Sequence, residues 1–152
     1  MTTLRATMGT ALRNALRDPV WWLLVVIAPL VWVALILYGS GIAPGRPALP
    51  ALLYGIALYP LLEEYIFRGL LQDGLRRHEA MRAHFGPISL ANVITSALFA
   101  ASHMISQSPL QAASIFLPSL AFGYVFERYR HIAPAILLHA FYNAGFLYLF
   151  VR

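Results

Sequence analysis

Six side chains that could carry out acid–base chemistry lie inside stretches of the chain that are otherwise apolar. They are Glu63, Glu64, Arg68, His103, His139 and Asn143. A charged residue at the centre of a membrane helix opposes insertion by about 2.5 to 3.5 kcal/mol, so the charged residues between positions 63 and 68 need partners or a function. Ionisable side chains inside a membrane helix are a functional-site hypothesis by default.

The spacing of these side chains indicates which of them can act together. Glu64 and Arg68 are four residues apart, so they share a helix face and can form an ion pair that offsets both burial penalties. Glu63 points about 100° away from that face and is left poised to exchange a proton as a general base or acid. His139 and Asn143 are also four residues apart and can present two hydrogen-bond donors to a developing oxyanion.

The elements that position these residues are expected to be membrane helices. The chain has 152 residues, of which 60% are hydrophobic and 11% are charged, and its mean hydropathy is +0.68. This composition excludes a disordered chain and a nucleic-acid-binding module. Apolar stretches long enough to span a bilayer cover residues 20–38, 48–72, 88–105, 109–126 and 132–151. We therefore expect one all-α domain over residues 1–152, a polytopic membrane helix bundle with about five transmembrane helices.

The distribution of arginine predicts how this bundle is oriented. The formal net charge is +5, all basic residues are arginines, and cysteine is absent, which excludes a thiol nucleophile and disulfides. Eight arginines fall on one side of the expected spans and two on the other, which places the N-terminus in the cytoplasm. Residues 1–18 are basic and carry an apolar residue at every fourth position, so they form either a helix on the membrane surface or a basic tail.

The candidate residues also form a pattern of three motifs. EExxxR occupies residues 63–68, FxxxH occupies 99–103 and HxxxN occupies 139–143, in that order and on separate expected spans. In these motifs the chain resembles the CAAX protease and bacteriocin-processing family of intramembrane proteases, also labelled CPBP or Abi. The resemblance covers residues 60–143, more than half of the chain, and each defining position of the motifs is matched.

The resemblance implies an intramembrane endopeptidase that hydrolyses a peptide bond near the C-terminus of a membrane-attached protein or peptide. The implied catalytic residues are Glu63, His103, His139 and Asn143, and the implied supporting residues are Glu64 and Arg68. In these roles Glu63 and His103 activate a water, while the other two catalytic residues stabilise the tetrahedral oxyanion. No metal or other cofactor is part of this mechanism.

The small size of the chain resembles a bacterial branch of the family that acts on C-terminal sorting segments of surface proteins. We therefore expect an integral protein of the bacterial inner membrane. Its expected partners are the lipid bilayer and a membrane-attached substrate, with no nucleic acid.

Other interpretations of the same residues stay open. Glu63, His103 and His139 could supply one carboxylate and two imidazoles to a catalytic zinc ion. The polar cluster could instead belong to a non-catalytic bacteriocin-immunity or membrane scaffold protein. A small proton- or ion-conducting bundle is a third hypothesis, because buried glutamates and histidines also form relays.

Overall fold

The computed structural model describes residues 6–37 and 47–150. Over these ranges most residues are helical and only four are in strands, so the all-α helix bundle expected from the sequence is confirmed. The expected span ends at 38 and 151 lie outside the described residues, and so do Arg5, Arg46 and Arg152 of the arginine count.

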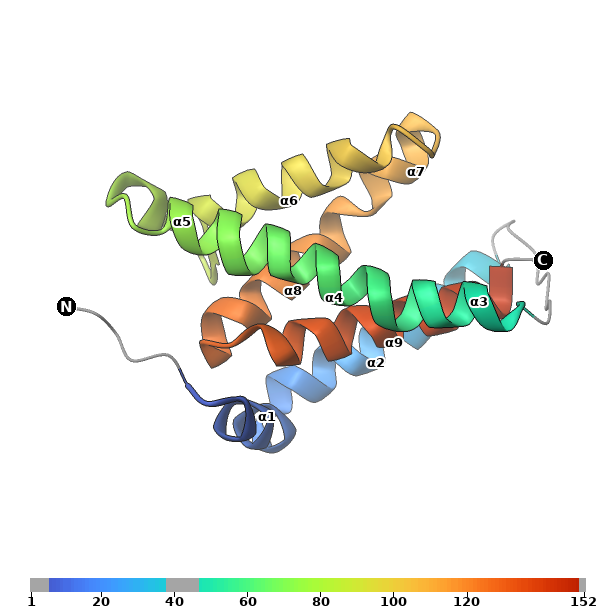
Figure 1. The fold of residues 1–152 in the computed structure, drawn as a ribbon, viewed down its shortest axis with the longest axis horizontal. Coiled ribbons are helices and arrows are strands. Elements are labelled where there is room, and N and C mark those ends of the chain that lie inside the picture. The colour runs from blue at the N-terminus through green and yellow to red at the C-terminus, as the bar shows by residue number, and fades with distance from the viewer. Residues whose placement is uncertain (1–5, 38–46, 151–152) are drawn as a thin grey trace.

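The helices and two short strands follow one another along the chain. They are α1 (Met8–Arg17), α2 (Pro19–Leu35), α3 (Leu49–Leu52), η2 (Leu53–Leu58), α4 (Tyr59–Glu64), η3 (Tyr65–Gln72), α5 (Asp73–Leu75), η4 (Ala80–Arg82), β1 (His84–Phe85), β2 (Ile88–Ser89), α6 (Leu90–His103), α7 (Pro109–Ser114), α8 (Phe116–Tyr129) and α9 (Ile132–Phe150). The elements from α3 to α5 continue directly into one another and form one long helix, called here the Leu49–Leu75 helix (Figure 1).

The expected number of membrane spans is only partly recovered. Among the described residues, Pro109–Tyr129 and Ile132–Phe150 are long and apolar enough to cross a membrane, and the count is three if α1 and α2, bent by 74°, form one span. The expected span 88–105 is represented by α6, whose 14 residues extend about 21 Å, less than the roughly 30 Å of a bilayer core. It starts late because a turn at Gly86, with a φ of 60°, joins β1 to β2, a hairpin that the sequence reading did not predict.

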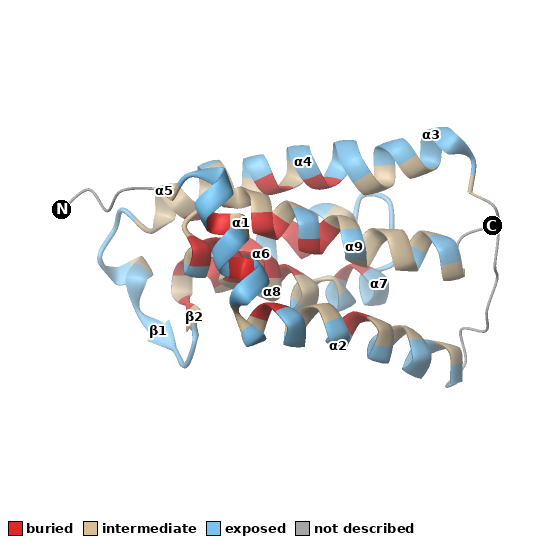
Figure 2. Ribbon diagram, turned by 90° about the horizontal axis from the view of Figure 1, so that it is seen from below, coloured by how far each residue is buried: buried red, intermediate tan, exposed pale blue. Residues whose placement is uncertain are grey.

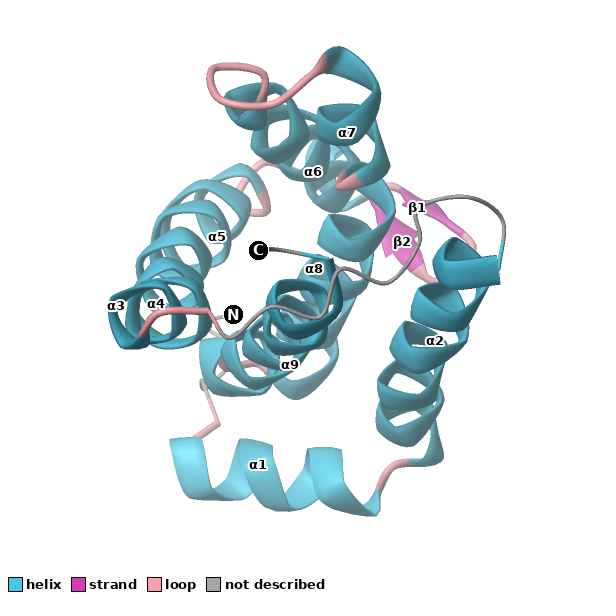
Figure 3. Ribbon diagram, turned by 90° about the vertical axis from the view of Figure 1, so that its right-hand side faces the viewer, coloured by secondary structure: helices cyan, strands magenta, loops and turns pink. Residues whose placement is uncertain are grey.

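The N-terminal segment contains a helix rather than an irregular tail. Its α1 lies crosswise to the helices that are seen end-on in Figure 3. Ala11 and Ala15, four residues apart, are buried against the bundle, whereas Met8 and Leu16 are exposed. At the corner, Asp18 caps α2 by accepting a hydrogen bond from the Val20 amide at 2.9 Å. The location of α1 on a membrane surface stays a prediction.

The hydrophobic core lies where α1, α2, α8 and α9 meet, and further buried residues, many of them polar, lie on α6 and the Leu49–Leu75 helix. Figure 2 shows the buried residues on the inward faces of these helices, while the outward faces of α2 and of the Leu49–Leu75 helix are mostly exposed. Phe122, Val125 and Phe126 of α8 pack with Ala135 and Leu138 of α9. Exposed apolar faces around a partly polar core are what a bundle surrounded by lipid needs.

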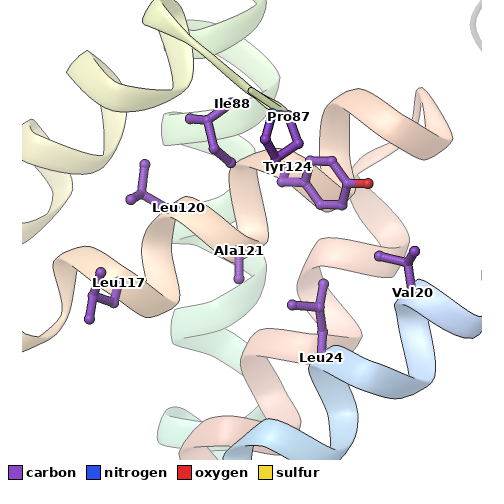
Figure 4. Close-up of a pocket in the computed structure, with 8 residues that line it drawn as sticks. All are labelled: Val20, Leu24, Pro87, Ile88, Leu117, Leu120, Ala121 and Tyr124. Carbon is purple, nitrogen blue, oxygen red and sulfur yellow. The ribbon is translucent and has the colours of Figure 1, made fainter. Parts of the chain in front are cut away.

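An apolar groove of about 360 Å³ lies between α2, the hairpin turn and α8 (Figure 4). Its α8 lining consists of Leu117, Leu120, Ala121 and Tyr124. At about 100° per residue, these positions are on the opposite side of α8 from Ser119 and Gly123, which face the Leu49–Leu75 helix. The groove is therefore separate from the polar cluster described next.

Candidate active site

A buried polar stripe runs along one face of the Leu49–Leu75 helix. Pro60, Glu64, Arg68 and Gln72 recur at every fourth position and are fully buried. In a regular α-helix a step of four residues rotates by about 400°, so the stripe would drift by about 40° per step. The wider π-helical turns of η3 counter this drift. The stripe therefore stays directed at α8 and α9.

Arg68 is the cation at the centre of this stripe. Its Nε donates to Glu64 Oε2 at 3.1 Å, so the ion pair expected from the spacing is present. Its Nη2 donates to the backbone oxygen of Ser119 at 3.1 Å and to the Ser119 hydroxyl at 2.7 Å, both on α8. A buried ion pair is tolerated only when the remaining donors are also satisfied, and these contacts of Arg68 supply that condition.

His139 of α9 lies between the two adjacent glutamates. Its Nδ1 is 2.9 Å from Glu64 Oε1, and its Nε2 is 3.6 Å from Glu63 Oε2. A carboxylate that pairs with Arg68 only accepts hydrogen bonds, so Nδ1 carries a hydrogen. The imidazole also stacks on Phe122 with 4.6 Å between ring centroids and 16° between planes. These contacts fix the position of His139 and place a hydrogen on its Nδ1.

Glu63 and Glu64 are neighbours with different surroundings. The Glu64 side chain is fully buried, whereas 29% of the Glu63 side chain is exposed. Glu63 interacts electrostatically with both His139 and His103. Glu63 is therefore the carboxylate that a water or substrate can reach, and Glu64 is the one that holds His139.

His103 closes the C-terminal end of α6 near the same cluster. Its Nδ1 bonds to the Phe99 carbonyl at 2.9 Å, and because a carbonyl only accepts, that nitrogen carries a hydrogen. The Nε2 of His103 is then left for a partner in the site. The Phe99 ring contacts the rings of Phe67, His103 and His139, with centroid distances of 4.9, 4.7 and 5.8 Å. The Phe99 ring thus contacts both imidazoles.

Asn143 lies one turn after His139 on α9. Its Nδ2 donates to the backbone oxygen of Gly55 in η2 at 2.9 Å. The amide nitrogen carries two hydrogens, so one remains for another acceptor. In the described part of the chain, the Asn143 side chain therefore hydrogen-bonds to the backbone of the Leu49–Leu75 helix and not to Glu63 or Glu64.

The zinc alternative can be compared with this arrangement. Within residues 6–37 and 47–150, no three His, Asp or Glu side chains form a group that could hold a metal ion. Glu63 interacts with both His103 and His139, and each imidazole has its Nδ1 on a protein oxygen, which leaves its Nε2 available. A histidine that binds a metal through Nε2 has the same kind of Nδ1 contact, so the zinc alternative stays open.

The sequence reading missed several residues that complete the cluster. Ser119 of α8 binds Arg68, Phe122 supports His139, and Gln72 extends the buried stripe. For Gln72 a signal was available, because it continues the spacing of four residues from Glu64 through Arg68. Ser119 and Phe122 lie far from the motifs in sequence, and their spacing alone contains no such signal.

Comparison with known proteins gives one family match. A family model described as "Type II CAAX prenyl endopeptidase Rce1-like" matches residues 44–145, more than half of the chain. No curated protein and no solved structure matches the chain. The matched range includes all three motifs and the helices that carry them.

Proposed function

Because the chain belongs to the type II CAAX prenyl endopeptidase Rce1-like family, we propose that it hydrolyses a peptide bond near the C-terminus of a membrane-attached protein, with Glu63 as general base. Membership implies a protease that acts within the membrane on membrane-attached substrates, in agreement with the resemblance found in the sequence. The observation that carries the choice of base is the contrast between the part-exposed Glu63 and the fully buried, fully engaged Glu64.

In the proposed reaction, Glu63 removes a proton from a water that also bonds to Nε2 of His103. The resulting hydroxide attacks the carbonyl carbon of the scissile peptide bond and forms a tetrahedral oxyanion. The remaining N–H of Asn143 donates to this oxyanion, and His139 donates to it from Nε2 in its imidazolium form, in which both ring nitrogens carry a hydrogen. The proton held by Glu63 then passes to the leaving nitrogen, the carbon–nitrogen bond breaks, and Glu63 returns to its starting state.

Two features of the site support this division of roles. Glu64 and Arg68 form an ion pair inside the protein. Arg68 is therefore engaged with Glu64, and the Glu63 carboxylate stays available to accept a proton. Glu64 also keeps the Nδ1 side of His139 occupied and turns its Nε2 towards Glu63. A positioned imidazole needs no reorganisation when the oxyanion forms.

Cleavage of defined membrane tails tests the proposal. The full chain is co-expressed with a library of C-terminal membrane tails, including bacterial sorting segments, and the products are identified by mass spectrometry. Glu63→Gln should abolish a cleavage that the wild type performs, because loss of a general base lowers rates by about 10² to 10⁴. The exposed Glu79→Gln is the matched control with the same change of charge.

Other outcomes would favour the alternatives left open by the sequence. Wild-type cleavage by Glu63→Gln would contradict the proposal, and no cleavage of any tail by the wild type would favour an immunity or scaffold protein. Loss of cleavage on addition of EDTA, restored by zinc, would favour zinc catalysis. Ion flux through proteoliposomes without cleavage would favour a conducting bundle.

We also propose that the protein lies in the bacterial inner membrane with its N-terminus in the cytoplasm. The support for the orientation is the arginine count, in which Arg13 and Arg17 precede α2 and Arg76, Arg77 and Arg82 follow the Leu49–Leu75 helix. Because the chain has no cysteine, single cysteines can be introduced without background. A cysteine at position 9 should resist a membrane-impermeant thiol reagent in intact inner-membrane vesicles of native orientation, unless the topology is reversed.

A further inference from the structure

A second, largely buried acid, Glu127, lies beyond the motif residues, at the end of α8. Glu127 accepts hydrogen bonds from Gln72 Nε2 at 2.7 Å and from the Ser89 hydroxyl at 2.6 Å, both through Oε1. Arg76 Nε lies 3.6 Å from the same oxygen. Only 9% of the Glu127 side chain is exposed. Glu127 therefore receives contacts from the Leu49–Leu75 helix and from the residue that caps α6.

These contacts determine which way the Gln72 amide points. Its Nε2 donates to the Gly123 carbonyl at 3.1 Å and to Glu127 at 2.7 Å, so both of its hydrogens meet acceptors. The amide oxygen is thereby turned towards Arg68, whose Nη1 lies 3.5 Å away. Without the Glu127 acceptor, Gln72 would lose one of the two contacts that hold this orientation.

α8 has a glycine, Gly123, at the point where the Gln72 amide approaches it. A Cβ atom added at Gly123 would overlap Asn92 Oδ1 and would lie 2.8 Å from Gln72 Oε1. Asn92 of α6 donates to the Leu120 carbonyl at 2.9 Å, one turn before Gly123. Two buried amides, from different helices, thus meet α8 at a position where there is no room for a side chain.

A continuous series of contacts therefore connects the end of α8 to the catalytic imidazole. It runs from Glu127 to Gln72, Arg68, Glu64 and His139. We propose that Glu127 and Gln72 are positioning residues, which hold the Arg68 guanidinium so that Glu64 presents His139 in its productive orientation. This inference rests on the proposed endopeptidase function, but the series itself lies outside the three motifs.

The proposal predicts a specific consequence of removing the charge of Glu127. In Glu127→Gln the amide oxygen can still accept, but the hydrogen bonds from Gln72 and Ser89 lose their charge assistance and weaken. The Gln72 amide is then held less firmly, and its oxygen is less well fixed beside Arg68 Nη1. Arg68 and Glu64 shift in response, and the bond to Nδ1 of His139 is weakened.

Enzyme kinetics on the purified full chain provide the first test. With the tail that the wild type cleaves, Glu127→Gln should lower kcat about ten-fold and change KM by less than about two-fold, because a misplaced catalytic group affects the chemical step. Glu127→Asp keeps the charge, withdraws the carboxylate by one methylene and should lower kcat less. Glu79→Gln makes the same change of charge at an exposed position and is the matched control.

A spectroscopic readout does not depend on activity. In ¹⁵N-histidine-labelled protein, with the His139 signals assigned by His139→Gln, the wild type should show a protonated Nδ1. In Glu127→Gln this resonance should move towards that of an unprotonated imidazole nitrogen, and in Glu79→Gln it should not. A loss of folding stability alone would leave the His139 spectrum of the folded protein unchanged.

The outcomes distinguish the positioning role from the endopeptidase function. The positioning role would be overturned if folded Glu127→Gln and Glu127→Asp had the kcat and the His139 spectrum of the wild type. If Glu63→Gln were inactive in the same experiment, the proposed endopeptidase function would still stand. If the wild type cleaves no tail, the endopeptidase fails, and the His139 spectrum still decides whether Glu127 positions the imidazole. If Glu127→Gln does not fold, the same comparison is made with Glu127→Asp.

Discussion

Glu64 Oε1 lies 2.9 Å from His139 Nδ1, although 75 positions separate the two residues in the sequence. Since the other oxygen of Glu64 binds Arg68 at 3.1 Å, both oxygens of this carboxylate are engaged in holding other groups. Its neighbour Glu63 contacts His139 only at 3.6 Å and is partly exposed. Two adjacent glutamates thus differ in role, because Glu64 faces the core and Glu63 faces its edge.

Replacing Arg68 by Met should be strongly destabilising. The substitution leaves the Glu64 carboxylate buried without its cation, which in proteins is destabilising by about 3 to 5 kcal/mol. Thermal unfolding in detergent measures the effect. Arg77→Met is the matched control, because Arg77 also pairs with an acid four residues away but is 79% exposed, and exposed pairs contribute about 0 to 1 kcal/mol. Equal losses in the two variants would contradict the central role of Arg68.

The two motif histidines should respond differently to substitution. His139 is buried and bonded to Glu64, so His139→Gln should lower both thermal stability and turnover. His103 is less buried, and its hydrogen bond goes to a carbonyl of its own helix. His103→Gln should therefore lower turnover while the unfolding temperature changes little. Parallel measurement of melting and cleavage distinguishes the two, and a large stability loss in His103→Gln would contradict this view of its contacts.

A side chain at Gly123 should disturb the contact between α8 and the two buried amides. Gly123→Ala places a Cβ against Asn92 and Gln72, and overpacking of this kind is destabilising by about 1 to 3 kcal/mol. Gly74 is also helical, but a Cβ added there would meet no atom within 4 Å, so Gly74→Ala should stabilise by about 0.5 to 1 kcal/mol. Unfolding measurements that gave the same sign for both variants would refute the close approach.

The ion pair at the corner between α1 and α2 should make stability depend on pH. Asp18 precedes α2, and the hydrogen bond from Arg128 holds the pKa of its carboxyl below the ordinary value of 3.8. The stabilisation is therefore complete above pH 3.8 and is lost as the pH falls through the lower folded-state pKa.

Asp18→Asn isolates this effect, because Asn remains a good N-cap for α2. The variant should lose about 1 kcal/mol or less at neutral pH, and the difference from the wild type should vanish at low pH. Melting temperatures measured from neutral pH down to about pH 2, below both pKa values, check the prediction. A difference that grows on acidification would contradict it.

Local geometry explains what the sequence predicted well. The pairing of Glu64 with Arg68 depends only on a helical spacing of four residues, and that spacing holds in the structure. The same applies to the all-α class, since long apolar stretches leave few alternatives for the backbone in a membrane. The contact of Asn143 with Gly55 and that of Arg68 with Ser119 depend instead on which helices are neighbours. Periodicity within one helix contains no information about its neighbours.

The boundaries of elements were predicted less well for a similar reason. The expected span at residues 88–105 begins with two strand residues, because Gly86 permits a tight turn and Ser89 caps α6. The imidazole in contact with Glu63 is that of His139, whereas the sequence reading associated Glu63 with His103. That association depends on the depth of each residue and on the distance between separate helices, which spacing along one helix does not give.

The π-helical turns of η3 make the buried stripe, rather than the ion pair, dependent on the winding of the backbone. In a regular α-helix Glu64 and Arg68 would still share a face, because one step of four residues displaces a side chain by only about 40°. Over the three steps from Pro60 to Gln72 the displacement would reach about 120°, and Gln72 would leave the face that meets α8. A designed bundle that used these residues would therefore need the widened turns as well as the amino acids.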